Sequence, residues 1–204
     1  MTRGKGMSGI NVLVGSAQRQ VRYGLVARIF HWTIVALLGA QFAVAWLMPE
    51  IHRTTRPEGL VAVHLSLGIL ILIVALFRIV WRLAHRVAFE EKRGLSHYFA
   101  NALHVLLYIL LLALPLLGWA NSSSRGWSIS LFGIIPLPVL VAKGSPAGHA
   151  MGDLHQVAAY VLLGAIGLHV IAALIHRFWL RDNVMDRMLL GSDATESRIG
   201  GRSK

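Results

Sequence analysis

Three histidines interrupt an apolar segment near the end of the chain. The stretch DLHQVAAYVLLGAIGLHVIAALIH, residues 153–176, holds His155, His169 and His176 at spacings of fourteen and then seven. Fourteen residues turn an α-helix by about 1400°, which is about 40° short of four full turns. His155 and His169 therefore share one helix face and lie about 21 Å apart along the axis. An imidazole in such a segment is typical either of a helix–helix hydrogen bond or of a ligand.

The composition indicates that these histidines lie in a membrane. Of the 204 residues, 55% are hydrophobic and 14% are charged, and the mean hydropathy is +0.61. A soluble domain has roughly 25% charged residues. The chain has no cysteine, which excludes disulfides, thiolate metal sites, iron–sulfur ligation and covalent haem attachment. A metal would need histidine, methionine, carboxylate or backbone oxygen ligands.

Four segments are long and apolar enough to cross a bilayer, which takes roughly 20 residues of helix. We expect these spans at about residues 26–48, 60–82, 98–119 and 152–179. A fifth apolar run, residues 129–142, is shorter and contains Pro136 and Pro138. It is more typical of an interfacial or re-entrant element than of a span. We expect a transmembrane domain over residues 21–191, a flexible cytoplasmic tail over residues 1–20, and a second cytoplasmic tail over residues 192–204.

The distribution of basic residues predicts the orientation. Sixteen of the twenty Lys and Arg residues lie before the first span, around the second-to-third connection, or after the fourth span. The other side has four, which are Arg53, Arg56, Arg125 and Lys143. By the positive-inside rule, both termini are cytoplasmic. The net charge of +11 is thereby explained by topology, and we expect no nucleic-acid partner.

Depth in the membrane pairs the histidines of different spans. His31 lies about five residues into the first span from the cytoplasmic side, and His64 lies about five residues into the second from the outer side. His31 therefore matches the depth of His169, and His64 matches the depth of His155. Two pairs between helices are predicted, one above the other across the membrane.

Haem fits two stacked histidine pairs. A flat macrocycle fits between helices of a bundle, and its iron takes one imidazole on each face. Without cysteine, we expect two non-covalent, b-type, bis-histidine haems. Six-coordinate iron has no open position, which favours electron transfer over oxygen chemistry. The small residues Gly68, Gly164 and Gly167 lie near the ligands in the sequence, and we expect them to let a ring approach closely.

Further polar residues in the spans are candidates for supporting roles. Arg78 follows His64 by fourteen residues, so it shares that face at the inner level; it would bind a haem propionate or snorkel to the interface. His104 has no depth partner and would bond a propionate, a quinone or another helix. His176 and the adjacent Arg177 lie at the cytoplasmic boundary, where they are either interfacial residues or part of a quinone site.

A second explanation of the histidine pairs is a transition-metal transporter, because imidazole also binds zinc and nickel. Such pathways usually need additional carboxylates or thiolates. The spans contain no Asp or Glu clearly inside the hydrocarbon, and Asp153 stands only at the start of the fourth. No P-loop, catalytic triad or dinucleotide-binding signature is present.

Several motifs together resemble the bacterial cytochrome b561 family. They are RIFHW (28–32), VHLSLGI (63–69), ALHVLLY (102–108), DLHQVAAYVLLGAIGLH (153–169) and HRFWLRDNVMDRML (176–189). The resemblance covers about residues 21–191. It implies four helices carrying two b haems, one on His31 and His169 and the other on His64 and His155. The chain departs from the family in an N-terminal extension of about twenty residues and in its outer loop between the third and fourth spans.

The resemblance also implies a role. The family is similar to the membrane cytochrome b subunits of some hydrogenases and formate dehydrogenases. Its members exchange electrons with the quinone pool, and some oxidise superoxide at the outer face.

We therefore expect an all-α membrane protein of the bacterial inner membrane, a four-transmembrane-helix bundle with two haems between the helices. The inner haem would exchange electrons with ubiquinone or menaquinone, and the outer haem with an unidentified periplasmic partner. Such a protein would be an oxidoreductase, for example a superoxide:quinone oxidoreductase. The alternative is a haem-bearing membrane-anchor subunit of a dehydrogenase, hydrogenase or reductase complex.

Overall fold

Four long helices make up the chain in a computed structural model that describes residues 24–52, 54–85, 95–181 and 185. They are α1 (Leu25–Leu47), α2 (Leu60–Ala84), α3 (Leu95–Ser124) and α4 (Pro146–Phe178). Each contains a membrane-length apolar segment, with mean hydropathy between 1.6 and 2.8. The prediction of an all-α protein with four membrane-spanning helices is confirmed. The two predicted tails, residues 1–20 and 192–204, lie outside the described residues.

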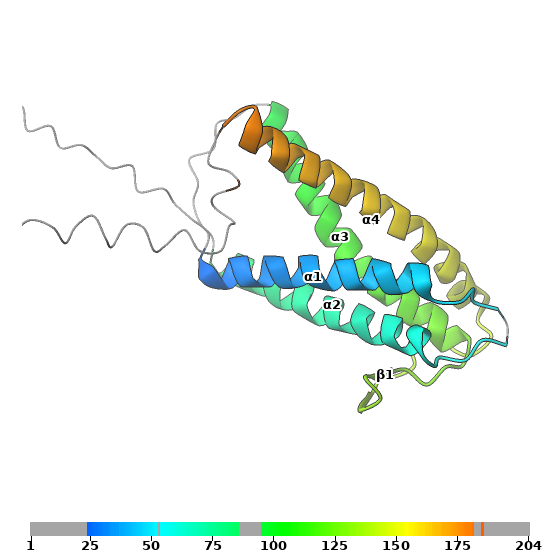
Figure 1. The fold of residues 1–204 in the computed structure, drawn as a ribbon. Helices are drawn as coiled ribbons and strands as arrows, with labels where there is room; N and C mark the ends of the chain where they lie inside the picture. Colours follow the sequence, from blue (N-terminus) through cyan, green and yellow to red (C-terminus); the bar gives the residue numbers. More distant parts are fainter. Residues whose placement is uncertain (1–23, 53, 86–94, 182–184, 186–204) are drawn as a thin grey trace, which may run out of the picture.

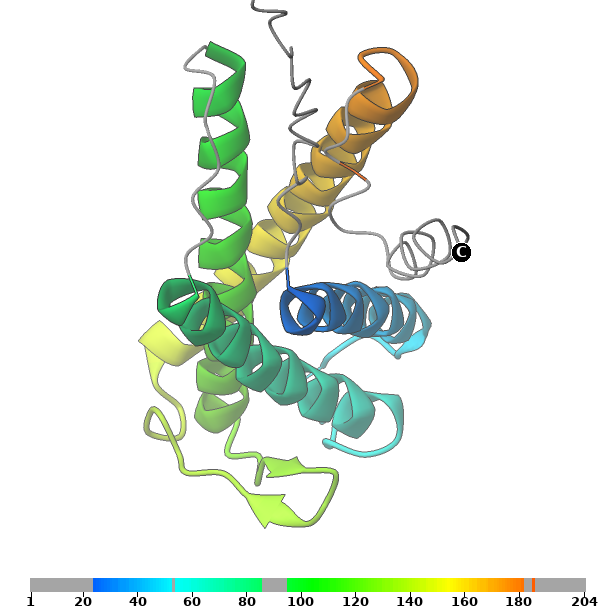
Figure 2. The ribbon, with the colours of Figure 1, turned by 90° about the vertical axis from the view of Figure 1, so that its left-hand side faces the viewer.

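The helices form two antiparallel pairs joined through α2 and α3. α1 packs along α2, α2 along α3, and α3 along α4. Among the described residues, no Cα atom of α4 comes within 8 Å of one in α1 or α2. Figures 1 and 2 show the α3–α4 pair diverging from the α1–α2 pair toward the end of the bundle where α1 begins. Only side chains bridge α4 to the first two helices.

Two apolar clusters hold the bundle together between the predicted histidine levels. One joins Ile34, Ile71, Ala75 and Leu111, and the other joins Leu110, Leu114 and Leu162. On every helix these residues lie between the polar or small residues of the predicted inner level and those of the predicted outer level. The large exposed side chains are also apolar, among them Phe77, Val105 and Ile171. An apolar exterior is what a bundle surrounded by lipid requires.

Helices α3 and α4 extend beyond the predicted spans at the outer side. α3 continues through Pro115 and ends at Ser124, five residues after Trp119. α4 begins at Pro146, where the Ser145 side chain caps the helix by accepting from the Gly148 backbone N–H at 3.3 Å. Gly148 lies so close to Ser124 that a Cβ would overlap the serine side chain. Small residues thus allow the two helices to approach each other here.

The fifth apolar run forms a small β-hairpin. β1 (Ser130–Leu131) pairs antiparallel with β2 (Ile135–Pro136), with Ser130 opposite Pro136 and Leu131 opposite Ile135. Figures 1 and 2 both show it beside α2, outside the bundle. It is neither a fifth span nor a helix.

Candidate functional site

The outer level of the bundle brings together His64 from α2 and His155 from α4. Their ring centroids lie 6.2 Å apart, with an angle of 75° between the ring planes. The Nδ1 of His155 lies 2.9 Å from the backbone oxygen of Leu114 in α3. Because a carbonyl oxygen only accepts, Nδ1 carries the proton and Nε2 presents its lone pair. A histidine held in this way is the usual form of a metal ligand.

Gln41 of α1 holds the other outer histidine. Its side-chain nitrogen lies 3.3 Å from Nε2 of His64 and 3.1 Å from the His64 backbone oxygen. The amide nitrogen can only donate, so Nε2 of His64 is an acceptor here as well. Both outer imidazoles therefore carry a lone pair on Nε2. The sequence prediction did not include Gln41, although it is an uncommon uncharged amide inside a span.

Gly118 of α3 makes the space for the His155 ring. A Cβ at this position would lie 3.2 Å from both Cε1 and Nδ1 of His155. Any larger side chain would push the ring away from Leu114, which lies one turn earlier on α3. Gly118 was absent from the sequence prediction because its role depends on how α3 is rotated about its own axis, which decides which of its faces meets α4.

The inner level brings together histidines from three helices. The rings of His31 in α1 and His169 in α4 have centroids 6.4 Å apart at an angle of 72°. His104 of α3 lies closer still to His169, with a centroid separation of 5.2 Å. The prediction that His104 lacks a partner at its depth is wrong, because α3 packs directly on α4. The Nδ1 of His104 donates to the Ala100 oxygen one turn earlier, at 2.6 Å.

Two arginines of α2 converge on Tyr108 beside the inner histidines. Arg78 donates from Nε to the Tyr108 hydroxyl at 3.4 Å and from Nη1 to the Ala27 oxygen in α1 at 2.9 Å. Arg82 donates to the same hydroxyl at 3.1 Å, and its guanidinium lies 5.5 Å from the Tyr108 ring centroid. Tyr108 lies one turn beyond His104, so this group adjoins the inner histidines. The sequence prediction included Arg78 but missed Tyr108, whose i+4 spacing from His104 was the available signal.

The last turn of α4 contains His176 and Arg177. His176 lies seven residues beyond His169, which is about 10 Å along the helix. A shallow, open depression lies on the surface at this end of α4, lined by Ile171, Leu174, Ile175, Phe178, Trp179 and Arg181. Neither His176 nor Arg177 is among its lining residues.

Two of the three glycines expected to let a haem approach lie away from the His169 imidazole. Gly164 and Gly167 precede His169 by five and two residues, so they lie about 140° and 160° around α4 from it. Both are exposed, and a Cβ on either would meet no atom within 4 Å. They face outward, away from the His169 ring. Gly68 does face inward, because a Cβ at this position would lie 3.6 Å from the side-chain nitrogen of Gln41.

The separation of the imidazoles in each pair matches the requirement of one shared iron. A metal–imidazole nitrogen bond is about 2.0–2.1 Å long. Two such bonds in line, plus roughly 1.1 Å from each nitrogen to its ring centre, place the centroids about 6.3 Å apart. The two pairs measure 6.2 and 6.4 Å. At this separation each pair can supply the two imidazoles of a bis-histidine haem, and at the outer level the Gln41 amide would have to release Nε2 of His64 to the iron.

Comparison with known proteins identifies the family. The family model described as prokaryotic cytochrome b561 matches residues 22–191. The chain belongs to the prokaryotic cytochrome b561 family. The resemblance seen in the sequence motifs is thereby confirmed, and with it a membrane protein that transfers electrons through b-type haem.

Relatives within this family cover most of the chain. It is 28% identical over 171 residues to cytochrome b561 homolog 2 of Escherichia coli, which covers 82% of this chain and 91% of that protein. It is also 28% identical over 174 residues to the probable superoxide oxidase CybB of Yersinia pestis, covering 82% of this chain and 96% of that protein. A third relative, cytochrome b561 homolog 1 of Escherichia coli, is 35% identical over 92 residues, covering 44% of this chain and 51% of that protein.

Proposed function

We propose that the protein moves electrons between the two faces of the membrane through two b haems. His31 and His169 would hold the inner haem, and His64 and His155 the outer one. The observation that supports this most strongly is the centroid separation of each pair, 6.4 and 6.2 Å. The haems supply a reversible one-electron carrier at each level, and the chain supplies ligands, burial and spacing.

We further propose that the ends with the inner histidines face the cytoplasm of a bacterial inner membrane. Arg78 and Arg82 lie near the end of α2, and Arg177 and Arg181 at the end of α4. The positive-inside rule places such residues on the cytoplasmic side. The β-hairpin and the α1–α2 connection then lie on the periplasmic side of the bundle.

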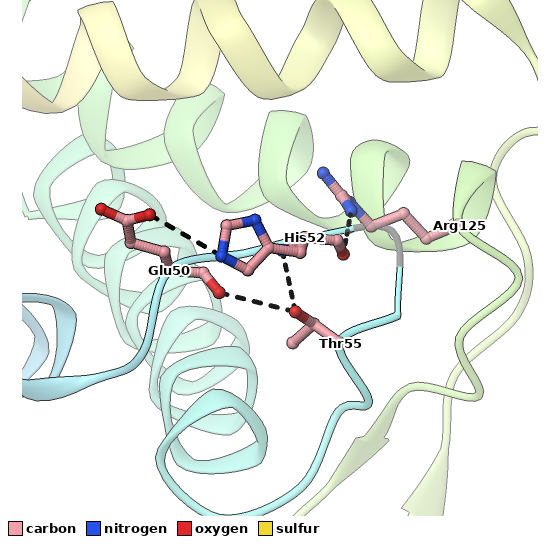
Figure 3. A network of polar contacts seen from close by, with 4 residues as sticks. All are labelled: Glu50, His52, Thr55 and Arg125. Atoms are coloured by element: carbon pink, nitrogen blue, oxygen red, sulfur yellow. Dashed lines mark hydrogen bonds and ion pairs between the residues drawn. The ribbon is translucent and has the colours of Figure 1, made fainter.

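The outer end has a polar network that links α3 to the α1–α2 connection (Figure 3). Arg125 donates from Nη1 to the His52 backbone oxygen at 3.3 Å, and the His52 backbone N–H donates to the Thr55 hydroxyl at 2.8 Å. The His52 ring lies 3.7 Å from the Glu50 carboxylate. Arg125 and Lys143 provide positive charge at the outer end of the bundle, which favours the approach of an anion.

Superoxide is the anionic donor that this proposal assigns to the outer face. Two superoxide ions each give up one electron and leave as O₂. A quinone takes up those two electrons with two protons and leaves as a quinol. The name of the Yersinia pestis relative, probable superoxide oxidase CybB, supports this assignment.

The quinone, ubiquinone or menaquinone, would bind at the inner end. His104 and Arg78 are the candidates nearest the inner histidines, and a haem propionate is the alternative partner for Arg78. A guanidinium has five donors, so its bonds to Ala27 and Tyr108 leave donors for such an anion. His176 and Arg177 are candidates for a position closer to the cytoplasm. The open, largely apolar depression at the end of α4 would lie against the quinone tail.

A metal-transport function receives less support from the structure. Among the described residues, no group of three or more His, Cys, Asp or Glu side chains is arranged to hold a metal ion. A transport path through the bundle would need several such groups in sequence.

The deciding experiment supplies enzymatically generated superoxide to the purified protein and follows reduction of a water-soluble quinone analogue. We expect quinol formation that slows with rising ionic strength and slows further in the double variant Arg125→Gln, Lys143→Gln. Arg56→Gln, in the same outer region, is the matched control for loss of charge alone. No quinol formation, together with copurification of a peripheral subunit, would instead show a membrane-anchor subunit.

A further inference from the structure

The connection between α3 and α4 contains an uncharged apolar excursion. Residues 126–142, GWSISLFGIIPLPVLVA, include no charged side chain and lie directly between Arg125 and Lys143. Several of its large side chains contact little of the protein. Phe132 is 54% exposed, Ile134 81% and Val139 69%. Such a surface is costly in water.

The hairpin in this excursion lies alongside α2 at membrane depth. The Ser66 hydroxyl donates to the Ser130 backbone oxygen at 3.3 Å and accepts from the Phe132 backbone N–H at 3.0 Å. Ser66 lies six residues beyond Leu60, which is about 9 Å along the helix. The 25 residues of α2 span about 37 Å. Centred on about 30 Å of hydrocarbon, α2 places Ser66 about 5 Å inside its outer boundary.

The views of the fold agree with this depth. Figure 1 shows β1 below the outer half of α2, and Figure 2 shows the hairpin to the side of the same helix. It does not project past the end of the bundle, where water begins. The lateral position is where lipid surrounds the helices.

The hairpin backbone is also suited to an environment with little water. Phe132 N–H is bonded to Ser66, Ile134 N–H donates to the Leu131 oxygen at 3.1 Å, and Leu137 N–H donates to the Ile129 oxygen at 2.9 Å. Pro136 and Pro138 have no N–H to satisfy. Unpaired backbone donors exclude most irregular segments from hydrocarbon. In the hairpin, these hydrogen bonds and the two prolines reduce the number of unpaired backbone N–H groups, and with it the free-energy cost of entering hydrocarbon.

The two ends of the excursion are tied together at the outer surface. The Gly144 N–H donates to the Ser124 oxygen at 2.8 Å. The Lys143 side chain covers Gly126, which has a positive φ of 74°. The Arg125 guanidinium lies 5.5 Å from the Trp127 ring centroid. Cations and a tryptophan at this point are typical of the headgroup level of a bilayer.

We propose that the β-hairpin is an anchor inserted among the acyl chains of the outer leaflet. The occupant of its exposed surface is lipid, with Phe132, Ile134 and Val139 in contact with the chains. A cavity of about 360 Å³ between the hairpin and α2, lined largely by apolar residues such as Val63, Leu65 and Ile129, would take part of one chain. Through Ser66, the anchor also fixes the outer part of α2, which carries His64.

The absence of native cysteine makes a direct test possible. Ile134→Cys and Val139→Cys place one thiol on the proposed anchor. Thr54→Cys, in the exposed α1–α2 connection, is the matched control on the same side. Each full-length variant is reconstituted into vesicles of phosphatidylethanolamine and phosphatidylglycerol. A membrane-impermeant maleimide is then applied to sealed vesicles and to vesicles opened by a pore-forming toxin.

We expect the anchor thiols to react at least tenfold more slowly than Thr54→Cys in sealed and in opened vesicles. A nitroxide attached at Ile134→Cys should collide more often with O₂ than with a water-soluble nickel chelate, and the nitroxide at Thr54→Cys should show the reverse. Equal labelling of all three thiols and preferential collision with the nickel chelate would overturn the proposal. That result would show a hairpin in water, available to a protein partner. Either anchor variant suffices if the other fails to fold.

Discussion

Replacing Gly118 by alanine should weaken haem binding at the outer level without weakening the helix. The added Cβ would lie 3.2 Å from Cε1 and Nδ1 of His155, whereas carbon contacts are most favourable at about 3.5–4.0 Å. The ring must therefore move by roughly 0.3–0.8 Å. A shift of this size away from α3 would lengthen the bond from Nδ1 to the Leu114 oxygen from 2.9 Å to the upper end of the usual hydrogen-bond range of about 2.7–3.2 Å, or past it.

The expected size of this effect follows from the role of that bond. Loss of a hydrogen bond that orients a metal-ligating histidine typically costs about 10–100-fold in affinity. The same substitution removes a glycine from a helix interior, which favours the helix by up to about 1 kcal/mol. Haem affinity and protein stability should therefore change in opposite directions.

The assay is haem transfer from the purified variant to excess apomyoglobin, followed by absorbance. One of two haems should leave about 10–100-fold faster than in the unmodified protein, while the other leaves at its original rate. Gly164→Ala is the matched control, because its Cβ would meet no atom within 4 Å. Unchanged transfer from Gly118→Ala would refute the reasoning, as would equal acceleration of both haems.

Two further predictions concern the ligands and the arginines. His64→Leu should lower the haem content from two per chain to about one, and His31→Leu should do the same for the other haem. The single haem left in one variant should differ in redox midpoint potential from the single haem left in the other. Identical redox titrations of the two variants would contradict the pairing. Tyr108→Phe removes an acceptor shared by Arg78 and Arg82, and should lower the free energy of unfolding by about 1–2 kcal/mol. A thermal melt in detergent measures this, with Tyr160→Phe on the exposed face of α4 as the control that should melt like the unmodified protein.

The sequence carried enough information to predict the spans and the histidine pairs. The fourteen-residue spacing can be interpreted from helix geometry alone. The depth of each histidine follows from counting residues from the membrane boundary, given the thickness of the bilayer. The structure brings His31 close to His169 and His64 close to His155. That these residues hold haem stays a prediction.

Features that depend on helix rotation and on close packing could not be predicted from the sequence. His104 meets His169 because α3 packs against α4 with that face inward, and no count of depth reveals azimuth. The contact of Gly118 with the His155 ring could not be predicted for the same reason. Helix α3 contains Pro115 and ends at Ser124, five residues beyond the predicted end of its span. The hairpin was predicted only as an interfacial or re-entrant element, because two-residue strands leave no periodic pattern.

We propose that each histidine pair holds one b haem. The most direct measurement is a pyridine haemochrome determination on the purified chain, combined with dithionite-reduced minus oxidised spectra. We expect two b-type haems per chain with the spectra of six-coordinate, low-spin iron. A colourless protein, or a single haem per chain in a preparation saturated with haem, would contradict it.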